Sequence, residues 1–217
     1  MQKVFEPWVG SDYECGGPHG CRILILGESH YGQPDKATLG FTNCIVGRYA
    51  ITERRRFFSV VQRLVSLDTQ RLRYSEASKR DFWNSVAFCN YVQAIVGPKA
   101  RCRPTPAMWA TGSAVLLHVL DELRPEVIVI LGKQLKKHLP PVPVGMQVAY
   151  ISHPSGRGMR YAECQPVIAA AIHRAVLARS SAQLALDAAK DDLQLELASS
   201  GLYGNAEVQG NAVSPMH

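Results

Sequence analysis

RILILGESHY, residues 22–31, joins a mostly apolar run of five residues to a glycine and four polar residues. Such a short apolar run, ending in turn residues, is typical of a buried parallel strand and the loop that follows it. Three other segments have the same character, at residues 86–90, 127–131 and 148–151. The sequence therefore predicts four short strands that are buried on both faces.

Segments with helical periodicity separate these runs. Apolar residues fall on one helical face over residues 57–65 and again over 115–123, and Thr105-Pro106 is typical of a helix start. Two further helices are expected over residues 165–179 and 184–197. The alternation predicts an α/β protein, a three-layer α/β/α sandwich with a short, mostly parallel four-stranded sheet.

Polar residues follow each predicted strand. They are Gly27 to Tyr31, Asn90-Tyr91, Gly132-Lys133 and residues 152–155. Because ligands bind at the carboxyl ends of strands in open α/β sheets, we expect these residues to form one site.

Length and composition favour one compact domain. The chain has 217 residues, of which 47% are hydrophobic, without the ~18 consecutive apolar residues of a membrane span. We expect a single domain over residues 1–198, with 199–217 as a flexible tail, because that tail has little apolar content. The first residues do not resemble a signal peptide, which favours a cytoplasmic location, nucleoid-associated in a bacterium. We also expect a monomer with no membrane partner.

The charge is unevenly distributed. The net charge is +6, but residues 48–103 carry twelve Lys/Arg against four acidic residues, while the segment from Ser181 onward is acidic. A basic body favours a polyanionic partner such as DNA, although a solubilising charged surface has the same composition.

The order of these pieces, Gly-Glu-Ser-His-Tyr after the first strand, Asn90 after the second, Gly-Lys after the third and His-Pro-Ser after the fourth, resembles the uracil-DNA glycosylase superfamily. The resemblance covers roughly residues 22–160, and the segments 103–106 and 123–132 are similar to that family's intervening segments. It implies a base excision repair enzyme that flips uracil, or another deaminated base, out of DNA and hydrolyses its bond to the sugar.

On the family's first motif, Gly27 takes the glycine position, Ser29 the position of a water-activating carboxylate, His30 that of a proline and Tyr31 that of a tyrosine. Serine is a poor base, so either Glu28 positions the water, or stabilisation of the leaving group carries the reaction. A capped loop with solvated side chains is the structural alternative.

Two aromatic residues are expected to shape the base pocket. The resemblance places Tyr31 against the C5 edge of the base, where a thymine methyl would clash, and Phe41 about where the family stacks an aromatic ring on the base. A buried strand-end tyrosine is the alternative for Tyr31.

Asn90 is the residue expected to read the base. Its amide oxygen can accept from N3–H of uracil while its nitrogen donates to O4, and cytosine presents the opposite pattern at both atoms. An asparagine that bonds only a neighbouring loop is the structural alternative.

The segment after the fourth strand is expected to supply catalysis and DNA contacts. The resemblance implies that a His153 N–H stabilises the negative charge on O2 of the departing base, and that Ser155 holds a phosphate. Arg157 or Met159 would fill the gap left by the flipped base, and Arg160 suits a phosphate, unless residues 156–160 are only a flexible turn.

We expect no cofactor and no metal ion. Some branches of the superfamily bind an iron–sulfur cluster through four cysteines, but Cys15 and Cys21 are spaced too widely for the early pair, and Gly112 lies near another ligand position. A zinc site formed by Cys15, His19 and Cys21 is an unusual alternative.

Two other functions compete with the glycosylase. The residues around Ser29 superficially resemble the nucleophile turn of a serine hydrolase, but they lack its second glycine. The chain is alternatively a non-catalytic DNA-binding relative of the fold, which the missing carboxylate favours.

Overall fold

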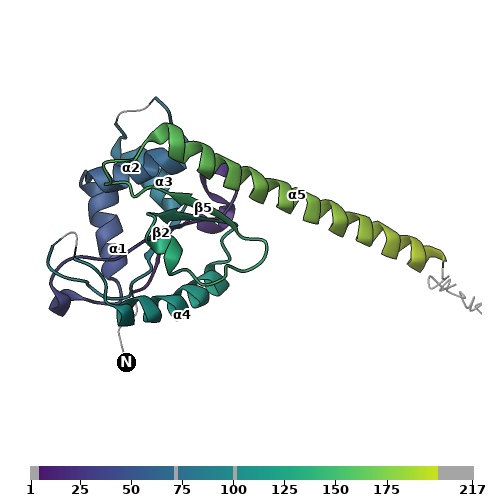
Figure 1. The fold of residues 1–217 in the computed structure, drawn as a ribbon. Helices are drawn as coiled ribbons and strands as arrows, with labels where there is room; N and C mark the ends of the chain where they lie inside the picture. The colour runs from purple at the N-terminus through teal and green to yellow at the C-terminus, as the bar shows by residue number, and fades with distance from the viewer. Residues whose placement is uncertain (1–4, 71–72, 100–101, 200–217) are drawn as a thin grey trace, which may run out of the picture. The chain divides into compact units, whose positions relative to one another are not determined.

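A mixed five-stranded sheet forms the centre of the protein (Figure 1). The structure, a computed structural model, describes residues 5–70, 73–99 and 102–199. The strand order is β1-β3-β2-β4-β5, with β1 antiparallel to β3 and the other three pairs parallel. The strands are β1 (Trp8–Val9), β2 (Ile23–Gly27), β3 (Ala87–Asn90), β4 (Val127–Leu131) and β5 (Gln147–Ile151).

The predicted α/β class is confirmed, but the predicted strand number of four is wrong. The four apolar runs correspond to β2, β3, β4 and β5, and β1 adds a fifth strand at the β3 edge. β1 has two residues, Trp8 and Val9, neither of them buried, and a run of two residues is too short for the sequence to predict a strand.

Helices cover both faces of the sheet, and Figure 1 shows α4 on one side with α2 and α3 on the other. Ile23 and Ile25 of β2 share a buried cluster with α2, α3 and the first turns of α5, whereas Leu24 and Leu26 share one with α4. Successive strand residues point to opposite faces, so each strand is buried on both sides. The helices are α1 (Phe41–Ile45), the π-helix η4 (Val46–Thr52), α2 (Arg56–Val65), α3 (Glu76–Asn84), α4 (Pro106–Leu123) and α5 (Tyr161–Ser199), and the 3₁₀ turns are η1 (Tyr13–Cys15), η2 (Gly17–His19), η3 (Pro34–Lys36) and η5 (Leu135–Lys137).

The chain forms two compact units, residues 1–178 and 179–217. In the first unit, Ile168, Ala171 and Ile172 of α5 are buried in the core. In the second, the described residues 179–199 are helical with exposed leucines. The two helices expected over 165–179 and 184–197 are thus one helix, and the predicted tail at 199–217 lies almost entirely outside the described residues. Among the described residues, no helix is long and apolar enough to span a membrane.

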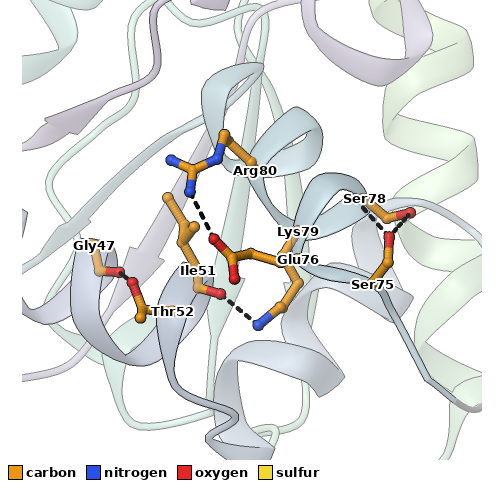
Figure 2. Close-up of polar contacts among 8 residues, drawn as sticks. All are labelled: Gly47, Ile51, Thr52, Ser75, Glu76, Ser78, Lys79 and Arg80. Atoms are coloured by element: carbon orange, nitrogen blue, oxygen red, sulfur yellow. Dashed lines mark hydrogen bonds and ion pairs between the residues drawn. The ribbon is translucent and has the colours of Figure 1, made fainter.

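The π-helix η4 is fastened to α3 by a buried lysine (Figure 2). Lys79 donates from Nζ to the carbonyl oxygen of Ile51, in the last turn of η4, where helix carbonyls lack partners of their own. The Thr52 hydroxyl donates to the Gly47 carbonyl at 3.2 Å, five residues earlier. The Ser75 hydroxyl caps α3 by accepting from the Ser78 N–H at 3.1 Å. The Lys79 bond joins η4 to α3, while the other two bonds each stabilise one of these helices.

Gly112 lets α4 pack directly on the residue that follows β3. A Cβ at position 112 would lie 2.5 Å from the Tyr91 ring and 2.6 Å from the Tyr91 carbonyl oxygen. The Tyr91 hydroxyl donates to the His138 carbonyl at 2.6 Å, so this ring has little freedom to move away. The contact with Tyr91 therefore leaves no space for a side chain at position 112.

Gly112→Ala is expected to lower the free energy of unfolding by about 1–3 kcal/mol, because the added methyl overpacks the contact with Tyr91. Gly47→Ala is the matched control, since a Cβ there meets nothing within 4 Å. It should be neutral or stabilising by up to about 1 kcal/mol. Urea unfolding followed by circular dichroism measures both, and equal stability of the two variants would refute this packing.

Candidate functional site

A cavity of about 890 Å³ opens at the carboxyl ends of the parallel strands. We call it the candidate cavity. The loops after β2, β4 and β5 line it together with the last residue of β3, as expected for an open α/β sheet. Eight of the eleven sequence-predicted site residues line it: Gly27, Glu28, Ser29, Tyr31, Asn90, His153, Ser155 and Arg157.

Gly27 and Asn90 determine the inner end of this cavity. They are register partners on β2 and β3. A Cβ at position 27 would lie 2.1 Å from Oδ1 of Asn90, so only glycine accommodates the amide where it lies. Asn90 is 6% exposed, and its backbone carbonyl accepts a 2.6 Å hydrogen bond from Nε2 of Gln93. No hydrogen bond joins the Asn90 amide to another described residue, and Asn90 lines the cavity, so the amide is available to a ligand there.

His153 follows β5 at the mouth of the cavity. The Ser155 backbone N–H donates to Nδ1 of His153 at 3.1 Å. Because Nδ1 accepts, the neutral ring carries its proton on Nε2. Partial burial lowers the pKa of His153 below its ordinary 6.5, which favours this neutral form. The ring therefore has one N–H to offer a ligand.

Glu28 and Ser29 supply the polar groups of the loop after β2. The Glu28 side chain is 16% exposed, and its carboxylate lies 3.8 Å from the Arg103 guanidinium. The Ser29 hydroxyl oxygen is buried without a hydrogen-bond partner among the described residues. A serine nucleophile needs a base within hydrogen-bond reach, so this geometry does not favour a serine hydrolase.

Three predicted site residues do not line the candidate cavity. Phe41 packs edge-on against His30, with ring centroids 5.1 Å apart, and also contacts Phe5. Met159 packs against the hydrophobic core, and Arg160 is exposed, 3.4 Å from the Glu163 carboxylate.

Four aromatic residues that sequence reasoning did not assign to the site also line the cavity: Tyr49, Phe57, Phe58 and Phe88. The Phe57 ring lies 5.7 Å from the His153 ring at an interplanar angle of 34°. Tyr49 belongs to η4, and the guanidinium groups of Arg48 and Arg55 lie over its ring, 5.2 and 4.7 Å from the centroid. Phe57 fits the apolar face of α2, so its sequence pattern predicts a core residue. For Tyr49, the available signal in the sequence is that an aromatic residue lies next to arginines.

Cations surround the cavity mouth. Arg103, Lys133 and Arg157 line the cavity and are exposed, whereas Glu28 is the one acidic residue in the described lining. Tyr31 lies beside them at 37% exposure. A ligand with a negative charge outside the cavity and a neutral part inside it would match this distribution.

Potential metal ligands are dispersed. Over residues 5–70, 73–99 and 102–199, no three His, Cys, Asp or Glu side chains are grouped to hold a metal ion. Cys15 is exposed, Cys21 is buried, and Nε2 of His19 is 2.7 Å from the Val65 carbonyl oxygen.

Comparison with protein-family models and with curated proteins gives no match to this chain. The fold and the site themselves define an α/β protein in which the Asn90 amide and the His153 imidazole line one cavity at the strand ends.

His30 makes stability depend on pH. It lies beside the cavity, buried against Phe5 and Phe41, with Nε2 hydrogen-bonded to the Thr42 hydroxyl at 2.9 Å. Burial lowers the pKa of His30 from 6.5 to about 4. Between these values the unfolded chain takes up a proton that the folded chain does not, so stability present above pH 6.5 is lost as the pH falls toward 4.

We expect the unfolding free energy of the wild type to fall by about 3 kcal/mol more than that of His30→Gln between pH 7 and pH 4. Gln keeps a hydrogen-bonding group for Thr42 but does not titrate. His118→Gln, at an exposed position of α4, is the control and should follow the wild type. Denaturant titrations at each pH measure this, and parallel curves for the wild type and His30→Gln would refute it.

Proposed function

We propose that this protein is a DNA glycosylase that flips uracil, or another deaminated base, into the candidate cavity and hydrolyses its N-glycosidic bond. The observation that carries the proposal is that the unengaged amide of Asn90 and the His153 ring line the same cavity. We also propose that the chain belongs to the uracil-DNA glycosylase superfamily and that its sheet is the short, mostly parallel sheet of that superfamily. The proposal also includes DNA as partner, a monomeric state and a cytoplasmic or nucleoid location.

Asn90 gives the pocket its selectivity in this proposal. Its amide offers one acceptor and one donor side by side, matching N3–H and O4 of uracil, whereas cytosine presents the reverse pattern. The burial of Asn90 makes this selection stringent. A mismatched base would leave both the Asn90 amide and the polar edge of the base desolvated and unpaired.

His153 stabilises the leaving group. Breaking the bond between C1′ and N1 leaves the electron pair on uracil, with negative charge on O2, and leaves the sugar cation-like. The Nε2–H of His153 donates to O2 as that charge develops. Water then adds its oxygen to C1′ and releases a proton, so the products are uracil and an abasic site.

The loop after β2 orients the water. Glu28 carries the carboxylate that accepts from the water, and the Arg103 guanidinium lies 3.8 Å from it. The buried Ser29 hydroxyl supplies a second polar contact on the same loop. Phe57 and Tyr49 offer flat apolar surfaces to the base, while Tyr31 limits its C5 edge.

The loop after β5 holds the DNA strand. Ser155 and Arg157 line the cavity beside His153, where a phosphate of the flipped nucleotide would lie. Since Met159 packs on the core, Arg157 is the better candidate to fill the gap in the duplex. Arg160 remains a candidate for a neighbouring phosphate.

We expect His153→Ala to lower kcat for uracil excision about 100- to 1000-fold, and Asn90→Ala to lower kcat/KM about 10- to 100-fold. His138→Ala and Asn43→Ala, the same residue types outside the cavity lining, should excise at the wild-type rate. Labelled uracil-containing DNA is incubated with protein and treated with alkali, which breaks the strand only where a base was removed.

Wild-type rates in both cavity variants would refute this site assignment. If the wild-type protein binds the DNA but leaves it resistant to alkali, the chain is a non-catalytic DNA-binding protein. The serine at position 29, where the family's most active members carry a carboxylate, is the feature that favours this second candidate.

The excision rate should also report on His153 through pH. Protonation at Nδ1 would set an N–H against the Ser155 N–H and break the bond that orients the ring. Because burial lowers the pKa of His153, kcat should be constant near neutral pH and fall only below 6.5. His153→Gln keeps an N–H donor without a titrating group, so it should be slower and lack this acidic limb. An acidic limb unchanged in His153→Gln would assign it to another group.

A further inference from the structure

A second hollow, of about 400 Å³, lies on the arginine-rich segment where α2 begins. Arg54, Arg56 and Arg63 line it together with the rings of Tyr74 and Tyr161. No acidic residue is among its described lining residues. We call it the arginine hollow.

The three arginines differ in how firmly they are held. Arg63 donates from Nε to the Asp68 carbonyl and from Nη2 to the Thr69 carbonyl, and its guanidinium lies 4.1 Å from the centre of the Tyr161 ring. Arg54 and Arg56 are exposed, and neither has an acidic partner among the described residues. The hollow therefore combines one fixed cation with two that are free to close on an anion.

The neighbouring Arg48 and Arg55, in contrast, share an acidic partner. Arg48 and Arg55 lie 2.6 and 3.5 Å from the carboxylate of Glu53. Positive charge is also unfavourable at the beginning of a helix, and α2 begins with Arg56 and has no acidic residue in its first turn. The uncompensated charge of Arg54 and Arg56 thus has no role in stabilising the fold.

One short segment separates the arginine hollow from the candidate cavity. Arg54 and Arg56 line the hollow, Phe57 lines the cavity, and Arg55 lies over the Tyr49 ring in the cavity wall. A nucleotide held beside Phe57 would therefore place the next stretch of its own strand at Arg54 and Arg56. The hollow accepts anions because of its charge, and its place beside the cavity suits a phosphodiester chain.

On the basis of the glycosylase function proposed above, we propose that the arginine hollow binds the phosphate backbone of the DNA strand that carries the flipped nucleotide. Arg54 and Arg56 each contact a phosphate, and Arg63 and Tyr161 form the rigid floor. The contact is independent of base sequence, so it anchors the strand and plays no part in choosing the base.

The test is the salt dependence of binding by the full chain to a fluorescein-labelled oligothymidylate, which contains no uracil. The slope of log K against log [salt] is negative, and each lost phosphate contact lowers its magnitude by about 0.7 for a single strand. We expect the double variant Arg54→Gln/Arg56→Gln to lower the magnitude of this slope by about 1.4. The matched control Arg80→Gln/Arg174→Gln, which removes two exposed arginines outside both hollows, should keep the wild-type slope.

An unchanged slope in the Arg54→Gln/Arg56→Gln variant, or an equal reduction in the control, would overturn the proposal, whether or not the protein excises uracil. Absence of any salt-dependent binding by the wild type would overturn it as well. Where uracil is excised, the Arg54→Gln/Arg56→Gln variant should raise KM and leave kcat at the wild-type value. A lowered slope in a protein that excises no base would support the arginine hollow and refute only the glycosylase function.

Discussion

The close approach of Gly27 to Asn90 is the constraint on which the candidate site depends. The absence of a Cβ on β2 leaves the space that the amide of β3 occupies, and a carbon there would lie 2.1 Å from Oδ1. The pairing continues past the strands, since the Tyr91 and Val92 N–H groups donate to the carbonyls of Gly27 and Glu28 at 2.9 Å. Strand register therefore sets both the position of the Asn90 amide and the course of the loop that carries Glu28 and Ser29.

The sheet order then determines what surrounds this contact. β2 lies between β3 and β4, with β5 beyond β4, so the loop after β2 sits between the Asn90 side and the His153 side of one edge. The wall outside the strand ends comes from η4 and α2, which contribute the rings of Tyr49 and Phe57. Because Lys79 fastens η4 to α3, the position of Tyr49 depends on a buried hydrogen bond well outside the cavity.

Sequence could predict the parts of the fold that have a regular period. The run at 127–131 and the run that follows Arg22 are apolar because their residues face helices on both sides, so the sequence predicts β4 to the residue and β2 to within one residue. β1 could not be found, since its two residues gain their strand conformation from pairing with Phe88 and Ala87. The π-helix and the packing of Phe41 away from the cavity arise in the non-periodic stretch between β2 and α2, where tertiary contacts alone decide which ring faces inward. Phe57 lies on the periodic face of α2, where the pattern predicts an apolar residue but not a cavity wall.

The lining of the candidate cavity combines neutral polar groups with cations. Burial lowers the pKa of both His30 and His153, so the imidazoles beside the cavity are neutral, and Asn90 is neutral by nature. The cations Arg103, Lys133 and Arg157 are exposed residues of the cavity lining, and Arg54 and Arg56 line the arginine hollow. Under the proposed function, a neutral base would lie among the neutral groups of the cavity, and the phosphates joined to it would lie against the arginines.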